Sequence, residues 1–447
     1  MPTSHPPLSP AGHLVRASSV DDMRQVLSSG SDGFVCEPIA MRDATAWRLT
    51  DGAISHVSGG FFSVVGVTPR GDDEGRPLVL LYQPQSAFNG LVVASRDDEL
   101  FVLLQARVEP GNLGVAQYGP TVQSTPANYL RVHGGRPTPY LECFQHARTG
   151  VAPVGDWTEL DLGSRYLLKN KRLVCVEAIG SLPVEPGFLW VPASLLKKAV
   201  LEGALMNTDL RSMLAVMPWS QWPSRDDLDD VGRAAHTSLA RRPRPAIIGG
   251  ALAQVGRPRP PVRLVPLTEL DHWDLNEYGL FELEPAAQGF DVQFFRIEAP
   301  TREVPRWTQP LLNSRTRGRV VLALAVVDGA LQALVHGRGE PGLSTGAAMY
   351  PTYVASPGGS APASDSAALE GLQACQPTTL AHTLESDEGG RFFRDESDFE
   401  LVLVDEAVDV GEDYRWVTLS ELKCLLGISN VCSIQLRCIA SMLLALL

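Results

Sequence analysis

The sequence predicts a mixed α/β (α+β) fold that occurs twice along the chain. Two observations predict it: short apolar runs precede helical patterns, and matching residues recur in the same order at a nearly fixed spacing. The spacing is 226 residues at both ends of the repeat and 231 in its middle, so the second copy gains five residues and later loses them. Six ordered matches with one compensated shift indicate a tandem duplication. The matches are Gln83-Pro84 with Gln309-Pro310, Glu109 with Glu340, Pro120-Thr121 with Pro351-Thr352, Arg165 with Arg391, Trp190-Val191 with Trp416-Val417, and Arg211 with Arg437.

Within each copy, strand patterns come before helical ones. Short apolar runs bounded by turn or charged residues predict strands, and Asp328-Gly329 supplies the turn of a hairpin. Apolar residues at helical spacing predict helices near the end of each copy. The predicted strands are 78–82, 91–94, 101–108, 320–327 and 330–336, and the predicted helices are 21–27, 192–203, 419–426 and 431–447.

The copies are expected to span residues 16–222 and 263–447. The segment between them, 223–262, is rich in Pro and Arg, which favours extended, solvated backbone and predicts a linker. Residues 1–15 are expected to be disordered.

Composition narrows the class of protein. A hydrophobic content of 44% allows a core of normal size. The net charge of −13 argues against a nucleic acid as the main partner, since phosphate backbones attract excess Lys and Arg. Neither a signal peptide nor a run long enough to span a bilayer is apparent, so no membrane partner is expected.

Missing motifs exclude several kinds of chemistry. The seven cysteines include no Cys-x-x-Cys pair, which argues against a disulfide framework or a zinc site and favours the cytoplasm. No glycine-rich dinucleotide fingerprint, Walker loop, metal-spaced His pair or Gly-x-Ser-x-Gly elbow occurs. No metal and no cofactor are therefore expected.

A first polar segment lies at the end of a predicted strand. A period of two places Gln105, Arg107 and Glu109 on one face of that strand, shortly before Asn112. A solvated strand face is the alternative interpretation.

A second polar segment follows at residues 119–134. Thr125 is a good N-cap, Pro126 suits the first helical position, and the short helix predicted after them places Tyr129 and His133 one turn apart. Gln123 and Asn128 lie close by, which favours a polar pocket over a capped surface helix.

A third polar segment lies in the second copy. An acidic run ends in Glu388 and a Gly pair before Arg391, a turn that suits phosphate binding or a plain acidic surface loop. The matching segment of the first copy has lost this character.

Together these segments resemble the NDP-hexose 2,3-dehydratase family over residues 34–444. The matching pieces are residues 56–62, 83–84, 105–112, 120–125, 128–129, 133 and 206–211 in the first copy, and 302–310, 386–392 and 414–419 in the second. The resemblance implies two tandem Nudix-like modules without Nudix metal chemistry, usually in a homodimer. It also implies a lyase of deoxysugar (antibiotic) biosynthesis. This enzyme removes water across C2 and C3 of a dTDP-4-keto-6-deoxyhexose to give the 3,4-diketo-2,6-dideoxy sugar. It needs no cofactor, and an NADPH-dependent 3-ketoreductase follows it.

The chain departs from the family pattern at two places. Residues 159–164 replace an expected Gln-Ser-Glu-Gln-Gly-Ser, and residues 351–356 replace an expected Pro-Thr-Val-Gln. Each copy keeps a different half of the pattern, so the catalytic pocket is expected in the first copy and a vestigial or auxiliary site in the second.

The expected site residues follow from these segments. Glu109, Tyr129 and His133 are expected to supply the base and the acid, with the assignment open. The residues expected to bind substrate are His56, Gln83, Gln105, Asn112, Thr121, Gln123, Asn128, Arg165 and Arg211. The residues expected at the second site are Gln309, Glu340, Glu388 and Arg391. Packing is the alternative for His56, and core pairing is the alternative for Arg211. The rival functions are a nucleotide-sugar binding protein and a Nudix-like pyrophosphatase, although the acidic helix of the latter is missing.

Overall fold

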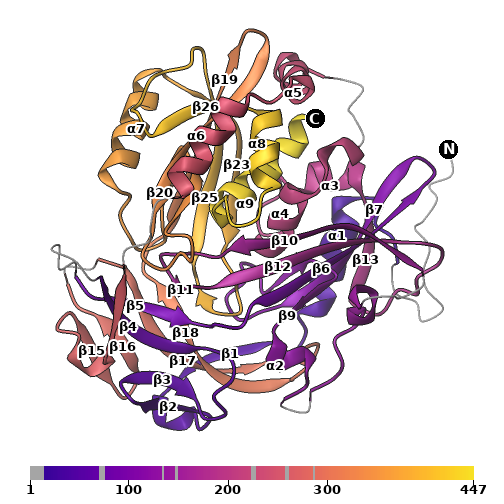
Figure 1. The fold of residues 1–447 in the computed structure, drawn as a ribbon. Coiled ribbons are helices and arrows are strands. Elements are labelled where there is room, and N and C mark those ends of the chain that lie inside the picture. Colours follow the sequence, from indigo (N-terminus) through magenta and orange to yellow (C-terminus); the bar gives the residue numbers. More distant parts are fainter. Residues whose placement is uncertain are drawn as a thin grey trace.

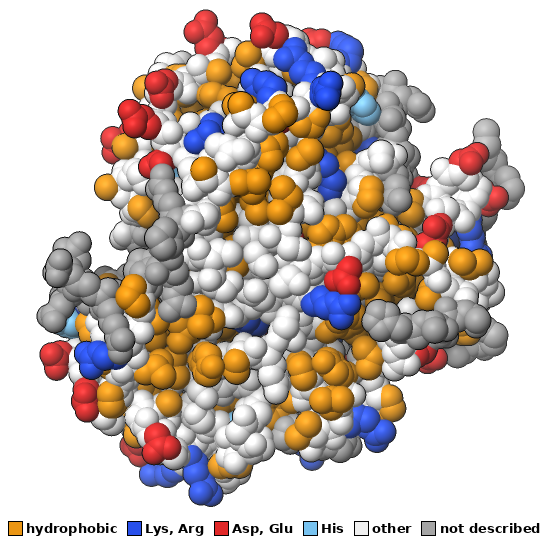
Figure 2. All heavy atoms as spheres, viewed as in Figure 1, with side chains coloured by type: hydrophobic (Ala, Val, Ile, Leu, Met, Phe, Trp, Pro, Cys, Tyr) orange, Lys and Arg blue, Asp and Glu red, His pale blue; other side chains and the backbone are white. Residues whose placement is uncertain are grey.

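A computed structural model describes residues 15–69, 76–132, 135–145, 150–222, 228–256, 261–284 and 287–447. These residues form four β-sheets with helices packed around them (Figure 1), and Figure 2 shows acidic and basic side chains together on the same face of the molecule. The prediction of a mixed α/β fold is confirmed. None of the described helices is long and apolar enough to cross a membrane.

The two larger sheets have the same strand order. In the first half it is β10 (Val151–Leu160), β12 (Asn170–Ala178), β6 (Ala87–Arg96), β7 (Glu99–Val108) and β13 (Phe188–Pro192), with β8 (Ala116–Gly119) on β7 and β9 (Val122–Ser124) on β6. In the second half it is β23 (Thr378–Ser386), β25 (Glu396–Val404), β19 (Gly318–Val327) and β20 (Ala330–Gly339), with β21 (Ala347–Pro351) and β26 (Tyr414–Thr418) on β20 and β22 (Tyr353–Ala355) on β19. The tandem repeat in the sequence is therefore also a repeat of topology.

The two smaller sheets also correspond to each other, and each takes one strand from the other half. The first contains β11 (Tyr166–Leu167), β5 (Leu78–Tyr82), β4 (Ser63–Pro69), β3 (Ala53–His56) and β2 (Trp47–Thr50). The second contains β24 (Phe392–Phe393), β18 (Arg306–Ser314), β17 (Phe290–Glu298), β16 (Gly279–Glu282) and β15 (Trp273–Asn276). Strand β1 (Val35–Ile39) pairs with β17, and β14 (Val262–Val265) pairs with β4. This reciprocal exchange joins the two halves through backbone hydrogen bonds in both smaller sheets.

The helices cover the larger sheets. Helices α1 (Val20–Gly30), α3 (Ala193–Ala199) and α4 (Thr208–Val216) belong to the first half. Helices α7 (Ala363–Ala374), α8 (Leu419–Leu426) and α9 (Ile434–Met442) belong to the second, and α4 packs against α9 (Figure 1). The helices predicted at both ends of the chain and before residue 203 are confirmed, with shifted ends.

The continuous apolar run of β19 shows why its sheet is covered on both faces. Val320, Leu322 and Leu324 enter the main core, whereas the alternate residues Val321 and Ala323 pack in a cluster that includes α7.

The extended backbone expected for residues 223–262 is wrong for most of that segment. It contains helices α5 (Asp230–Ala240) and α6 (Pro245–Val255), while residues 223–227 and 257–260 lie outside the described part, as do residues 1–14. Pro245 sits in the first turn of α6, where its missing N–H costs nothing, so the Pro-rich run marks a helix start rather than a linker. Helix α6 packs on β20 as α1 packs on β7.

Backbone contacts between the halves explain the repeated Glu-Pro-Gly segment. The N–H of Gly111 donates to the carbonyl of Gly389 at 2.9 Å, and the N–H of Gly342 donates to the carbonyl of Gly163 at 2.9 Å. A Cβ at Gly111 would lie 1.5 Å from the carbonyl oxygen of Phe392, and one at Gly342 would lie 1.8 Å from that of Tyr166. Only glycine permits either approach.

Candidate active site

A cavity of about 550 Å³ lies between the two halves of the chain. Strands β6, β7, β9 and β12 of the first half contribute to its lining, as does the start of α4. Strands β17 and β18 of the second half and the loops at 302–304 and 388–391 contribute the rest, together with β2 and β3. This volume suits a ligand of nucleotide-sugar size.

Aromatic side chains gather at one part of the cavity. The Trp47 ring lies 4.7 Å from Phe62 and 5.3 Å from His56, between ring centroids. The guanidinium of Arg391 lies 4.5 Å from the centre of the Phe62 ring. Trp307 also lines this part, and its indole N–H donates to Gln309 at 2.9 Å. Flat rings next to guanidinium groups suit a nucleobase and its phosphates.

Glu109 follows the end of β7 and is 4% exposed. Its Oε1 accepts hydrogen bonds from Arg107 at 2.8 Å and from Arg302 of the second half at 3.2 Å. Its Oε2 is buried and has no hydrogen-bond partner among the described residues. A half-paired buried carboxylate is costly, and a ligand or a proton would satisfy it.

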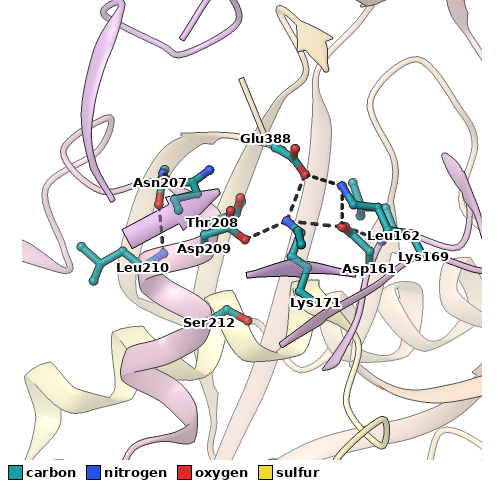
Figure 3. A network of polar contacts seen from close by, with 12 residues as sticks. Asp161, Leu162, Lys169, Lys171, Asn207, Thr208, Asp209, Leu210, Ser212 and Glu388 are labelled. Carbon is teal, nitrogen blue, oxygen red and sulfur yellow. Dashed lines mark hydrogen bonds and ion pairs between the residues drawn. The ribbon is translucent and has the colours of Figure 1, made fainter. Parts of the chain in front are cut away.

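A dense charge network reaches the cavity through Lys171, Asp209 and Glu388 (Figure 3). The ammonium of Lys171 lies 2.7 Å from Asp209, 3.0 Å from Glu388 and 3.3 Å from Asp161. Lys169 lies 3.1 Å from Asp161 and 3.0 Å from Glu388. Glu388 reaches this network from the second half, so the site is complete only when the two halves are joined.

The network shifts the pKa values of its members in opposite directions. Burial disfavours the charged form of Lys171, but Asp161, Asp209 and Glu388 outweigh burial and hold its pKa well above the ordinary value. Burial likewise opposes ionisation of Glu388, yet the neighbouring cations hold its pKa well below the usual range. The pKa of Asp209 is raised, first by burial and also by repulsion from Glu388 and Asp161, against the attraction of Lys171.

Amide and hydroxyl groups complete this part of the lining. Both amide atoms of Asn89 and the hydroxyl of Ser124 are buried without hydrogen-bond partners in the described part of the chain. Gln123 lines the cavity and accepts a hydrogen bond from Asn207 at 2.8 Å, and Asn128 lines it nearby. Buried polar groups in proteins are normally satisfied, so these unpaired groups indicate that a polar ligand binds here.

The structure places part of the expected site at this cavity and part elsewhere. The expected residues that line it are His56, Glu109, Gln123, Asn128, Gln309, Glu388 and Arg391. The expected residues that do not line it are Gln83, Gln105, Asn112, Thr121, Tyr129, Arg165, Arg211 and Glu340. His133 lies outside the described residues.

The helix expected to carry Tyr129 is shorter than its sequence suggests. Helix α2 covers only Pro126–Tyr129. Thr125 occupies its N-cap position, as predicted, but the Thr125 side chain makes no hydrogen bond to the helix. Pro126 does occupy the first turn, as predicted. Tyr129 is half-buried and outside the cavity lining.

Two residues expected to bind substrate have structural contacts instead. The Thr121 hydroxyl donates to the Leu103 carbonyl at 2.5 Å and accepts from the Val92 N–H at 2.9 Å, which ties three strand segments together. Arg211 forms a buried ion pair with Glu385, as its core alternative predicted.

The residues expected at a second site do not form one. Gln309, Glu388 and Arg391 line the cavity that contains Glu109, and Glu340 pairs with Arg338 at 2.6 Å. The separate pocket of the second copy has a volume of only about 10 Å³.

Sequence differences between the copies explain why the pocket of the second copy is so small. Val320 and Val354 pair at the strand positions where the first copy pairs Asn89 with Gln123. Ser397, Gln435 and Leu162 occupy the positions of Lys171, Asp209 and Glu388 after the 226-residue shift. Tyr350 is buried at the position of Gly119 after the 231-residue shift. The residues that match the polar lining of the first cavity are thus replaced, and little space remains between them.

Several lining residues were missed from the sequence. Asp209 and Arg302 lie inside segments that carry the family resemblance, so those segments already contained the signal. Lys171 lines the cavity, and Lys169 pairs with the same carboxylates without lining it; their spacing of two was the available sign of this cationic pair. Asn89 lies in an apolar run and gave no signal.

The fold and the cavity together define a class of protein. A duplicated mixed α/β chain that holds carboxylates, lysines and unpaired amides in one buried cavity is suited to acid–base catalysis on a small polar substrate. Residues 27–217 and residues 254–443 both match the model of the NDP-hexose 2,3-dehydratase family. The chain belongs to this family.

Three relatives are similar over most of their lengths. The proteins named dTDP-4-dehydro-6-deoxy-alpha-D-glucopyranose 2,3-dehydratase from Streptomyces violaceoruber and Saccharopolyspora spinosa are 30% and 27% identical to this chain, over 89% and 93% of it. The matches cover 90% and 88% of those relatives. A protein of the same name from Amycolatopsis orientalis is 27% identical over 93% of this chain and 88% of its own length.

Proposed function

We propose that this protein is a dTDP-4-keto-6-deoxy-D-glucose 2,3-dehydratase, a hydro-lyase that forms dTDP-3,4-diketo-2,6-dideoxyglucose. The observation that carries the proposal is the cavity between the halves, which has aromatic and guanidinium groups in one part and acid–base groups in another. Family membership and the printed activity of the three relatives support it.

The chemistry requires a base, an acid and a rigid polar pocket. The C4 ketone acidifies the proton on C3, and a base removes that proton to give an enolate. The C2–O bond then breaks as an acid protonates the leaving hydroxyl. The resulting enol takes a proton at C2 and loses its O–H proton, which gives the diketo sugar without any change in oxidation state.

The lining favours one orientation of the substrate. The nucleobase would lie among Trp47, Phe62 and Trp307, with the diphosphate near Arg302 and Arg391. The ketosugar would then reach the network, where partnerless amide and hydroxyl groups meet its hydroxyls. Among the residues expected to bind substrate, His56, Gln123 and Asn128 retain that role in the proposal.

Glu109 is the proposed base. Two guanidinium groups hold Oε1 in place, and Oε2, which has no hydrogen-bond partner among the described residues, is the atom that would take the C3 proton. Tyr129 and His133 stay predictions for the acid.

The test is Glu109→Gln, which keeps the shape and removes the basic oxygen. Loss of the 4-keto sugar is followed with a 3-ketoreductase and NADPH present, since the diketo product is unstable. A loss of about 10²–10⁴-fold in turnover is expected for a general base. Normal turnover would remove Glu109 from the mechanism.

One incubation in D₂O separates the rival functions. The dehydratase incorporates solvent deuterium into the sugar and consumes the 4-keto substrate. A binding protein would be stabilised thermally by dTDP-sugars without incorporating deuterium. A pyrophosphatase would release thymidine monophosphate when magnesium is added.

The family resemblance supports further proposals. We propose that the two modules are Nudix-like, that the protein is a homodimer in the cytoplasm, and that an NADPH-dependent 3-ketoreductase takes its product in deoxysugar (antibiotic) biosynthesis. We also propose that the second module begins near Pro245, because α6 packs on β20 as α1 packs on β7.

A further inference from the structure

Asp209 lines the cavity, although the sequence did not indicate it as a site residue. It lies in the first turn of α4, whose N-cap Asn207 accepts a hydrogen bond from the Leu210 N–H at 2.9 Å. The cap fixes the start of the helix, and the Asp209 side chain lines the cavity although it is only 4% exposed. Its Oδ1 is held by Lys171 at 2.7 Å, and its Oδ2 has no hydrogen bond to any described residue (Figure 3).

The ion pairs around Asp209 join more carboxylates than ammonium groups, although Arg107 and Arg391 also act on Asp209 and Glu388 at longer range. The network holds three carboxylates, on Asp161, Asp209 and Glu388, against two ammonium groups, on Lys169 and Lys171. Repulsion among neighbouring carboxylates is costly in a buried network, and a proton on one of them relieves it.

Asp209 is the member of the network best placed to hold that proton. Glu388 accepts hydrogen bonds from Lys169 at 3.0 Å and from the Tyr166 hydroxyl at 3.2 Å, in addition to its contact with Lys171, and these favour its ionised form. Asp209 has one cationic partner, and the raised pKa described above agrees with a retained proton.

Lys171 itself is poorly suited to act as the acid. Its ammonium lies within 3.3 Å of three carboxylates, which hold it in the charged form. Its high pKa also makes it a weak proton donor at neutral pH.

We propose that Asp209 is the general acid that protonates the C2 hydroxyl of the sugar as it leaves. This inference rests on the proposed dehydratase function. The base removes the C3 proton, and its electron pair forms the enolate. When the C4 carbonyl re-forms, the C2=C3 bond forms, the C2–O bond breaks, and the proton of Asp209 completes the departing water.

The proton count closes at the end of the turnover. The enol formed at C3 returns its O–H proton to the Asp209 carboxylate, and C2 takes the proton held by Glu109. Both carboxyl groups regain their starting states, and one water has been lost.

The experiment separates proton removal at C3 from loss of the C2 hydroxyl. The Asp209→Asn variant and the unchanged protein are incubated with dTDP-4-keto-6-deoxyglucose in D₂O. Deuterium at C3 of the recovered substrate is read by NMR, and dehydration is read through the ketoreductase. We expect Asp209→Asn to slow dehydration about 10²–10⁴-fold while exchange at C3 continues. Glu109→Gln should lose both readings together.

Asp161→Asn is the matched control, because Asp161 also contacts Lys171 but does not line the cavity. It alters a carboxyl group of the same network without altering the cavity lining, and we expect it to keep the ratio of exchange to dehydration of the unchanged protein. If Asp209→Asn loses exchange and dehydration equally, or if Asp161→Asn uncouples them as strongly, Asp209 is not the acid.

A second substrate tests the same step in another way. Fluoride leaves with little need for protonation, so a 2-deoxy-2-fluoro analogue of the 4-keto sugar should bypass the acid. We expect fluoride release by Asp209→Asn to come within about tenfold of the unchanged protein. An equally severe loss with this analogue would overturn the proposal.

Two results keep this inference distinct from the proposed function. If the unchanged protein leaves the 4-keto sugar intact, the dehydratase function itself fails, and the role of Asp209 fails with it. Should Asp209→Asn not fold, Asp209→Ser gives the same two readings, since it also removes the carboxyl group.

Discussion

Gly111 lies so close to the backbone of Phe392 in the other half that Gly111→Ala should destabilise the protein. A Cβ at this position would lie 1.5 Å from the carbonyl oxygen of Phe392 and 2.6 Å from its carbon. Carbon and oxygen normally approach to about 3.3 Å, so the two backbones would have to separate by about 1.8 Å.

The cost follows from this displacement. The hydrogen bond from Gly111 to Gly389, 2.9 Å long, would break, which costs about 1 kcal/mol net. Overpacking at an interface that cannot relax adds about 1–3 kcal/mol, so a loss of about 2–4 kcal/mol in the free energy of unfolding is expected. The displaced loop carries Glu388 and Arg391, and a misplacement of about 1 Å in a catalytic site can cost about 10²-fold in rate.

The assay is urea unfolding combined with kcat/KM. Gly342→Ala should lose a similar amount of stability, because its Cβ would lie 1.8 Å from the carbonyl oxygen of Tyr166. Gly249→Ala is the control: Gly249 is exposed within α6 with nothing near its Cβ, and alanine there should gain up to about 1 kcal/mol. A Gly111→Ala protein within about 0.5 kcal/mol of the unchanged protein and fully active would refute this account of the interface.

Two more predictions concern buried polar groups. Thr121→Val should lose about 2–3 kcal/mol of stability with KM unchanged, because it leaves the Val92 N–H and the Leu103 carbonyl unpaired. Thr352 makes the matching contacts in the half whose pocket is filled, which supports a structural role, and a large rise in KM would instead restore Thr121 as a binding residue. Burial raises the pKa of Glu159 and of Glu385 to about 7, against the attraction of Arg437 and Arg211. Because the folded state binds these protons more tightly than the unfolded state, stability should be greatest below about pH 4.5 as far as these groups are concerned, and it should fall between about pH 4.5 and 7, by up to about 3 kcal/mol per group. Urea titrations across this range should show the fall, and Glu385→Gln should make it smaller, whereas an unchanged pH dependence in that variant would show that Glu385 ionises freely when folded.

The sequence predicted the cavity-lining residues of the first copy better than those of the second copy. Glu109 and Gln123 follow or lie on strands whose period of two indicates which face they share, and both line the cavity. Gln309, Glu388 and Arg391 lie in the second copy, so the sequence predicts a separate site for them. Sequence distance gave no sign that their loops cross to the first copy.

The sequence by itself determined the duplication, the mixed α/β class and the family. Apolar periodicity, turn residues and ordered matches between the copies indicate these properties, so they can be predicted without knowledge of the tertiary contacts. Helices α5 and α6 could not be predicted from local sequence. Their Pro and Arg residues favour a linker, and only the packing of their apolar residues on β20 shows that the segment is helical.

Only the tertiary structure decided that the two halves share one working site. Reciprocal strand exchange and the contact of Gly111 with the opposite loop bring Glu388 next to Lys171, residues more than 200 positions apart. The pKa shifts at Asp209 and Glu388 arise from that packing. They depend on burial and on charges a few ångströms away, and neither quantity is set by neighbours along the chain.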